Sequence, residues 1–139
     1  MEFELDPRLA ADSHRVADGP VCQVRLMDDT RFPWLVLVPR IAGAIEWFDL
    51  DDADRHLLLD EVSQAARLLR EQSGCDKINI GALGNIVRQL HVHVVARSTG
   101  DAAWPGPVWG SGEAKRFSAD ALETRLAELR EQWARRDWT

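Results

Sequence analysis

The sequence predicts an α+β fold in a single domain spanning residues 1–139, with an antiparallel sheet. One long segment carries apolar residues at helical spacing, and several short segments are either alternating or continuously apolar, as in strands. These strand-like segments come in pairs joined by short turns, which favours antiparallel pairing. The length fits one domain that buries a core without disulfides, and the composition, 45% hydrophobic and 29% charged, is typical of a globular protein.

The first elements are a short helix and two strands. Pro7–Ser13 suits one or two helical turns, because proline is favoured in a first turn. Residues 21–27 alternate as a strand, and 28–30 form a turn. The continuous apolar run 34–38, ended by Pro39, predicts an interior strand covered on both faces.

A long helix and a hairpin follow. Asp51 is a suitable N-cap, apolar residues recur at helical spacing, and Gly74 marks the helix end. Residues 76–82 predict a strand, Gly84-Asn85 a turn, and 89–96 a second strand that pairs with the first.

The C-terminal part combines an irregular loop with a helix. Residues 104–110 contain prolines and glycines that exclude a regular helix or central strand. Ser118 is an N-cap candidate for a helix over about 118–135, whose apolar stripe is a core face.

Charge and composition narrow the functional classes. The formal net charge of −6 argues against extended nucleic acid as a partner. The N-terminus is acidic and no apolar run reaches membrane-spanning length, so we expect a cytoplasmic protein without a membrane partner. Cys22 and Cys75 are too few for a disulfide framework. The segment from Arg88 to Arg97 has two arginines, two histidines and no acid, which favours a compact anion site.

The most informative motif is Gln89-Leu90-His91-Val92-His93, on the predicted hairpin. Alternate side chains of a strand share a face, so Gln89, His91 and His93 form one polar row, which we expect to be exposed while the intervening residues enter the core. Neutral imidazole acts as nucleophile, base or metal ligand near pH 7. The row is therefore a candidate catalytic site.

These residues resemble the histidine triad (HIT) superfamily of nucleotide-binding hydrolases and transferases. The family motif is His-x-His-x-His followed by apolar residues, and this chain has Gln at the first position in 89–97. Upstream, 35–40 (Leu-Val-Leu-Val-Pro-Arg) looks like the family's apolar strand, and Asn79 and Gly84-Asn85 fall in the expected order. The resemblance covers about residues 20–110.

The resemblance implies a HIT-like fold, usually a homodimer, and a reaction at a nucleotide α-phosphate. His91 occupies the nucleophile's position, which implies a nucleotidyl-histidine intermediate. His93 would hydrogen-bond the phosphate or the leaving group. Gln89 can hold His91 in orientation but cannot act as an acid or base. The expected partner is a nucleotide or phosphorylated small molecule.

The resemblance also suggests nucleotide contacts. Asn85 keeps the amide of the family's phosphate-binding turn, and Asp28 or Asp29 falls near the ribose-binding position. Arg97 is a candidate anion contact, and Trp109, with Trp104, resembles aromatic segments that reach a neighbouring subunit's site. Two further positions depart from the family: Trp34 replaces a histidine, and Ile86 replaces a residue bearing a hydroxyl.

Two alternatives stay open. The departures at Gln89, Trp34 and Ile86 favour a nucleotide- or phosphometabolite-binding module with little or no catalysis. A metal-dependent enzyme could instead use His91 and His93, but no zinc-ligand spacing such as His-Glu-x-x-His is present. We therefore expect no required cofactor, with adventitious divalent metal possible at the histidine pair.

Overall fold

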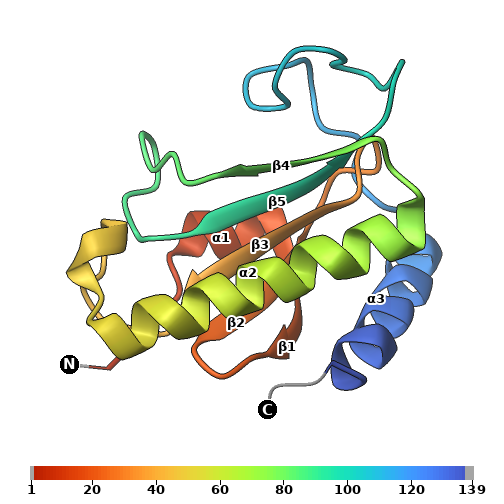
Figure 1. The fold of residues 1–139 in the computed structure, drawn as a ribbon. Helices are drawn as coiled ribbons and strands as arrows, with labels where there is room; N and C mark the ends of the chain where they lie inside the picture. Colours follow the sequence, from red (N-terminus) through yellow and green to blue (C-terminus); the bar gives the residue numbers. More distant parts are fainter. Residues whose placement is uncertain (1, 137–139) are drawn as a thin grey trace.

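The structure, a computed structural model, describes residues 2–136. It has an antiparallel sheet in the order β1-β2-β3-β5-β4, with helices packed on it (Figure 1), which confirms the predicted α+β fold. The strands are β1 Ser13–Asp18, β2 Cys22–Met27, β3 Trp34–Pro39, β4 Lys77–Gly81 and β5 Val92–Arg97. The helices are α1 Pro7–Asp12, α2 Asp52–Ser73 and α3 Ala119–Ala134, with a 3-10 turn at Trp47–Asp49.

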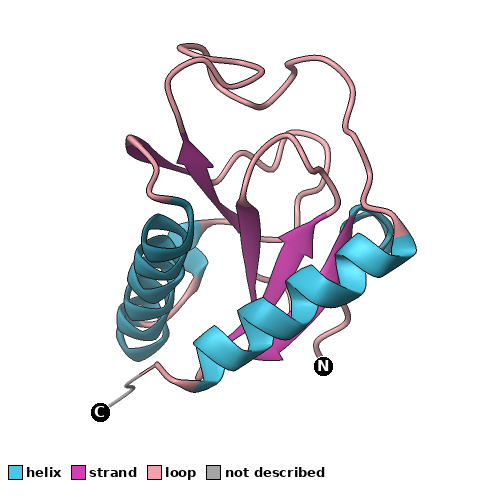
Figure 2. Ribbon diagram, turned by 90° about the vertical axis from the view of Figure 1, so that its right-hand side faces the viewer, coloured by secondary structure: helices cyan, strands magenta, loops and turns pink. Residues whose placement is uncertain are grey.

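Both faces of the sheet are covered, by different parts of the chain. Figure 1 shows α2 crossing in front of the strands and α1 behind them, and the long irregular segments lie above the strands in Figure 2. Strand β3 is buried throughout, as predicted for an interior strand. Its Leu35 and Leu37 pack in the core formed with α2 and α3, whereas Trp34 and Val36 pack in a second cluster on the α1 side. The two faces thus have separate apolar contacts.

Helix α2 begins and ends at the predicted residues. The Asp51 side chain accepts a hydrogen bond from the Asp54 backbone N–H, and Gly74 adopts the left-handed conformation that ends many helices. Glu61 on this helix is fully buried and accepts hydrogen bonds from the backbone N–H groups of Val21 and Cys22. The helix is thereby fixed to the start of β2 by polar as well as apolar contacts.

Helix α3 matches the predicted helix over 118–135, with Ser118 as the N-cap whose hydroxyl accepts from the Ala121 N–H. Its buried residues Leu129 and Trp133 join the core beside α2. None of the helices within residues 2–136 is long and apolar enough to cross a membrane.

Two strand predictions need correction. Strand β1 was not expected, because its sequence Ser-His-Arg-Val-Ala-Asp is mostly polar; it lies at an edge of the sheet and is held by pairing with β2. The predicted strand 89–96 is observed as β5, Val92–Arg97, so residues 89–91 precede the strand. Strands β4 and β5 do pair as a hairpin, with Gly81 opposite His93.

Candidate active site

His91 and His93 lie on the α1 side of the sheet, where they line a cavity of about 510 Å³. Segments distant in sequence contribute to its lining: α1 with the start of β1, the end of β2 with the turn after it, β3, and β5 with the loops before and after it. The lining residues are Leu9, Asp12, Ser13, Met27, Asp28, Asp29, Arg31, Trp34, Leu83, Gly84, Asn85, Ile86, Val87, His91, His93, Val108, Trp109, Gly110, Ser111, Gly112, Ala114 and Arg116.

The His91 ring is held by the backbone. Its Nδ1 lies 2.6 Å from the carbonyl oxygen of Gln89. A carbonyl oxygen only accepts hydrogen bonds, so Nδ1 must carry the proton and donate it. In the neutral ring the lone pair is then on Nε2, so Nε2 is the nitrogen that can act as a nucleophile.

His93 has the opposite tautomer. The Trp34 indole Nε1–H donates to His93 Nδ1 at 3.0 Å, and an indole nitrogen can only donate. The neutral His93 therefore carries its proton on Nε2. Burial, with a smaller contribution from the charge of His91, lowers the pKa of His93 to about 3, so the ring stays neutral at physiological pH. His93 is a fixed hydrogen-bond donor rather than a cation.

The expected exposure of the polar row is wrong for the two histidines. His91 is 7% exposed and His93 6% exposed, because side chains from other segments cover this face of the sheet. The His93 ring centroid lies 5.0 Å from His91, 5.5 Å from Trp109 and 5.6 Å from Trp34. The alternation itself is confirmed, because Leu90, Val92 and Val94 pack in the opposite core.

The hydrogen bonds of the Gln89 side chain go to the N-terminal segment and not to the histidines. Its Oε1 accepts from the Asp6 backbone N–H and its Nε2 donates to the Glu4 carbonyl, both at 2.8 Å. Orientation of His91, which we expected from the glutamine side chain, comes instead from the Gln89 backbone carbonyl.

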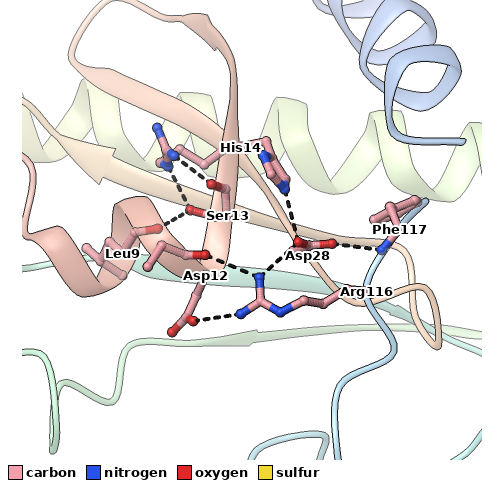
Figure 3. Close-up of polar contacts among 9 residues, drawn as sticks. Leu9, Asp12, Ser13, His14, Asp28, Arg116 and Phe117 are labelled. Carbon is pink, nitrogen blue, oxygen red and sulfur yellow. Dashed lines mark hydrogen bonds and ion pairs between the residues drawn. The ribbon is translucent and has the colours of Figure 1, made fainter. Parts of the chain in front are cut away.

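Asp28, which lines the cavity, lies at the centre of a polar network (Figure 3). Its carboxylate accepts from the Phe117 N–H at 2.9 Å and from Arg116 at 3.0 Å, and it pairs with His14 at 3.1 Å. Burial alone would raise the pKa of Asp28, but the hydrogen bonds from Phe117, His14 and Arg116 together lower it. Asp28 therefore stays ionised and joins β1 to the segment before α3.

Asp29 also lines the cavity, and its carboxylate accepts more hydrogen bonds than the carboxylate of Asp28. It forms an ion pair with Arg31 at 2.8 Å and accepts from the backbone N–H groups of Arg31 and Lys115. These bonds outweigh the effect of burial and lower the pKa of Asp29. Because a carboxylate has about four lone-pair directions, Asp28 retains more capacity for a ligand hydroxyl than Asp29 does.

Arg97 needs a revised assignment, since it is 1% exposed and does not line the cavity. Its guanidinium donates to both carboxylate oxygens of Asp101 and to Asn79 Oδ1. The same contact lowers the pKa of Asp101. The charge of Arg97 is thus paired with Asp101, and the guanidinium holds the loop after β5 outside the cavity lining. Trp104 lies over this guanidinium, 5.8 Å from ring centroid to Cζ, and also lies outside the cavity lining.

Asn85, Ile86 and Trp109 do line the cavity. Asn85 is exposed, and Ile86, at 80% exposure, presents an apolar side chain where a hydroxyl was expected from the resemblance. Trp109 packs against Gly81 of β4, where an added Cβ would lie 2.8 Å from the indole Cη2. The absence of a side chain at Gly81 thus makes room for Trp109 beside His93.

Sequence reasoning missed several cavity residues. Trp34 was noted only as the loss of a histidine, although it fixes the tautomer of His93. Leu9, Ser13 and Arg116 come from segments without a recognisable motif, and only the tertiary fold brings them to the site. No group of three or more His, Cys, Asp or Glu side chains suited to a metal occurs within residues 2–136.

Comparison with known proteins gives consistent matches. A family model described as HIT domain matches residues 8–100. Three solved structures are similar along nearly their whole length. The histidine triad protein of Sinorhizobium meliloti 1021 is 48% identical, with a TM-score of 0.90, over 94% of this chain and 96% of that one. The Bradyrhizobium japonicum protein is 43% identical, with a TM-score of 0.91, over 95% and 98% of the two chains.

The third, a histidine triad protein of Marinobacter aquaeolei VT8, is 40% identical, with a TM-score of 0.93, over 95% of this chain and 96% of that one. Among proteins with curated descriptions, the sequence comparison found no match. The family model spans more than half of the chain and these relatives match nearly all of it. The chain belongs to the histidine triad (HIT) family.

Proposed function

We propose that the protein is a nucleotide hydrolase or nucleotidyl transferase that acts at an α-phosphate through a nucleotidyl intermediate on His91. HIT proteins are generally nucleotide-binding hydrolases or transferases. The observation that carries the proposal is the state of the His91 ring: Nδ1–H donates to the Gln89 carbonyl, which leaves the lone pair on Nε2 of a residue that lines the cavity.

In the first step, His91 Nε2 forms a bond to the α-phosphorus while the bond from phosphorus to the leaving group breaks. The leaving group takes that electron pair, and an amine leaving group also takes a proton from solvent. The imidazole becomes positively charged on phosphorylation, and the Gln89 carbonyl oxygen, 2.6 Å from Nδ1, stabilises that charge.

In the second step, the oxygen of water or of another acceptor bonds to phosphorus and its proton passes to solvent, while the P–N bond breaks and its electron pair returns to His91 Nε2. With water the product is a nucleoside monophosphate. His93, neutral and with its proton on Nε2, donates to a phosphoryl oxygen in both steps and does not change its charge. Asn85 adds an amide, and Trp109 contributes an aromatic wall.

The part of the cavity lining formed by Asp28 suits the sugar. Asp28 is ionised there and has acceptor capacity beyond its three partners, so it is the better candidate for a ribose hydroxyl; Asp29 orders Arg31 and the 111–116 segment around it.

We also propose a homodimer. Strand β4 lies at the sheet edge, and it carries Ile80 at 55% exposure, followed by Leu83 at 45%. An open edge with exposed apolar side chains favours pairing with another strand.

The proposal is tested with a panel of nucleoside phosphoramidates and dinucleoside polyphosphates. We expect turnover that His91→Ala lowers by about 10³-fold or more, as for other nucleophile deletions, while His56→Ala, at an exposed position on α2, leaves it unchanged. Unchanged turnover in His91→Ala contradicts the proposal. Nucleotide binding without turnover would instead indicate the binding module, and loss of activity on chelation would indicate a metal enzyme at the His91 and His93 pair.

A further inference from the structure

We propose that Gln89 is a positioning residue whose side chain holds the N-terminal arm, residues 3–12, as one wall of the nucleotide cavity. On this view glutamine at the first position of the motif sets the shape of the binding site and does not support the chemistry. The role of the cavity rests on the proposed function, but the positioning of the arm does not.

The contact between Gln89 and the arm uses both ends of the side-chain amide. Oε1 accepts from the Asp6 N–H and Nε2 donates to the Glu4 carbonyl, each at 2.8 Å. The amide therefore pairs with two main-chain groups two residues apart, as a neighbouring strand pairs with an extended segment. Histidine cannot reproduce this pairing, because the two ring nitrogens point in diverging directions while the two groups of an amide lie side by side.

Other contacts place the arm against the site. Arg8 donates to the Ile86 carbonyl at 3.1 Å, which ties α1 to the loop before the motif. Phe3, Leu5 and Leu9 pack in the apolar cluster that includes Trp34. Three residues at the end of the arm or just after it line the cavity: Leu9, Asp12 and Ser13. Loss of the Gln89 contacts therefore affects the cavity through the arm.

The backbone and side chain of Gln89 have separate tasks. The backbone carbonyl fixes the tautomer of His91, and any residue at this position supplies that carbonyl. Both hydrogen bonds of the side chain go to the arm. A substitution of Gln89 should therefore weaken nucleotide binding and raise KM, with little change in kcat.

Hydrogen exchange measures the arm directly, without a nucleotide. Gln89→Met keeps the length of the side chain but removes both hydrogen bonds. Gln89→His introduces the family's usual residue. We expect the Asp6 amide, whose N–H is bonded to Gln89 Oε1, to exchange about tenfold faster or more in both variants. Gln64→His, on α2 across the sheet, is the matched control and should leave Asp6 exchange unchanged.

Binding and kinetics test the effect on the cavity. With AMP and GMP as binding probes, we expect Gln89→Met and Gln89→His to raise Kd about tenfold, the size expected for two hydrogen bonds. With a purine nucleoside phosphoramidate as substrate, we expect the same variants to raise KM about tenfold, with kcat within about threefold. Leu5→Ala, which loosens the arm through its apolar contacts and leaves Gln89 intact, should raise Kd in the same direction.

The outcomes separate the two proposals. Unchanged Asp6 exchange in Gln89→Met and Gln89→His overturns the positioning role. A fall in kcat without a change in KM also overturns it, as does a gain of turnover in Gln89→His. If no nucleotide binds to the wild-type protein, the proposed function fails, whereas accelerated exchange at Asp6 still establishes that Gln89 holds the arm.

Discussion

The two cavity histidines differ in tautomer because different partners fix them. His91 donates from Nδ1 to a backbone carbonyl, whereas His93 accepts at Nδ1 from the Trp34 indole. One ring thus keeps a free lone pair on Nε2 and the other keeps an N–H there. The pair divides into a nucleophile and a neutral donor, a division that the sequence motif alone does not contain.

The buried state of His93 predicts a particular pH dependence of stability. Its pKa is about 3 in the folded protein against an ordinary value of 6.5, so between these values the unfolded chain binds more protons and acid favours unfolding. Relative to His93→Gln, which does not titrate, we expect the wild-type free energy of unfolding to fall by about 2 kcal/mol more between pH 6.5 and 5.

Urea unfolding across this pH range measures the effect. Above pH 7 the difference between wild type and His93→Gln should be constant, because His93 is neutral in both folded and unfolded states there. Parallel curves for the two proteins between pH 6.5 and 5 would contradict the buried, neutral state of His93.

Six of the site residues predicted from the sequence lie together in the structure, although their functional roles stay predictions. His91, His93, Asn85, Asp28, Asp29 and Trp109 all line one cavity. Arg97 does not, because Asp101, four residues along in an irregular loop, neutralises it. The partners of Gln89 lie 83 and 85 residues away, and no local pattern predicts such a contact.

At the scale of elements, the site depends on the loop after β5. Arg97 binds Asp101 at the start of this loop, and Val108 and Trp109 return from it to the cavity. Strand β4 makes room for the indole at Gly81. The hairpin and the loop are therefore fitted to each other beside His93.

This fit predicts a coupled pair of substitutions. In Gly81→Ala the new Cβ would lie 2.8 Å from Trp109 Cη2, so the indole must shift, and we expect a loss of about 1–3 kcal/mol in stability with weaker nucleotide binding. In a Trp109→Phe background, which lacks the second ring, the same change should cost less than half as much. A double-mutant cycle by urea unfolding measures this coupling. Equal costs in both backgrounds would contradict the contact.

The sequence predicted elements well where burial imposes a clear pattern. Helix α2 has an N-cap, an apolar stripe and a glycine stop, and β3 is a continuous apolar run, so their bounds were close to those observed. Strand β1 has no such pattern. Arg15 and Asp18 form an ion pair with each other, and pairing with β2 determines the conformation of the strand. The path of the 98–117 segment depends on tertiary contacts and was predicted only as irregular.

In the whole molecule, one face of the sheet forms the larger core and the other face carries the candidate site. Helices α2 and α3 cover one face and form the larger apolar core, while the other face carries the cavity and the arm. Strand β4 is left at one edge of the sheet (Figure 1), and its Ile80 side chain is exposed. We propose a homodimer, and this edge is where we expect the second copy.

The dimer prediction is checked by size-exclusion chromatography with light scattering. We expect a mass near twice 15.7 kDa for the wild type. Ile80→Lys places a charge on the exposed edge strand and should shift the equilibrium to monomer, whereas Thr124→Lys, on the exposed side of α3, should not. A monomeric wild type at concentrations of tens of micromolar, or an Ile80→Lys variant that remains dimeric, would contradict this arrangement.

We predict that His91 becomes covalently linked to the nucleotide, and intact-protein mass spectrometry detects such a bond. The protein is mixed with a purine nucleoside phosphoramidate, quenched under mildly basic conditions and analysed with peptide mapping. We predict a mass gain of one nucleoside monophosphoryl group, located on His91 and absent from His91→Ala. An adduct that forms equally in His91→Ala, or that maps to another residue, would contradict the account.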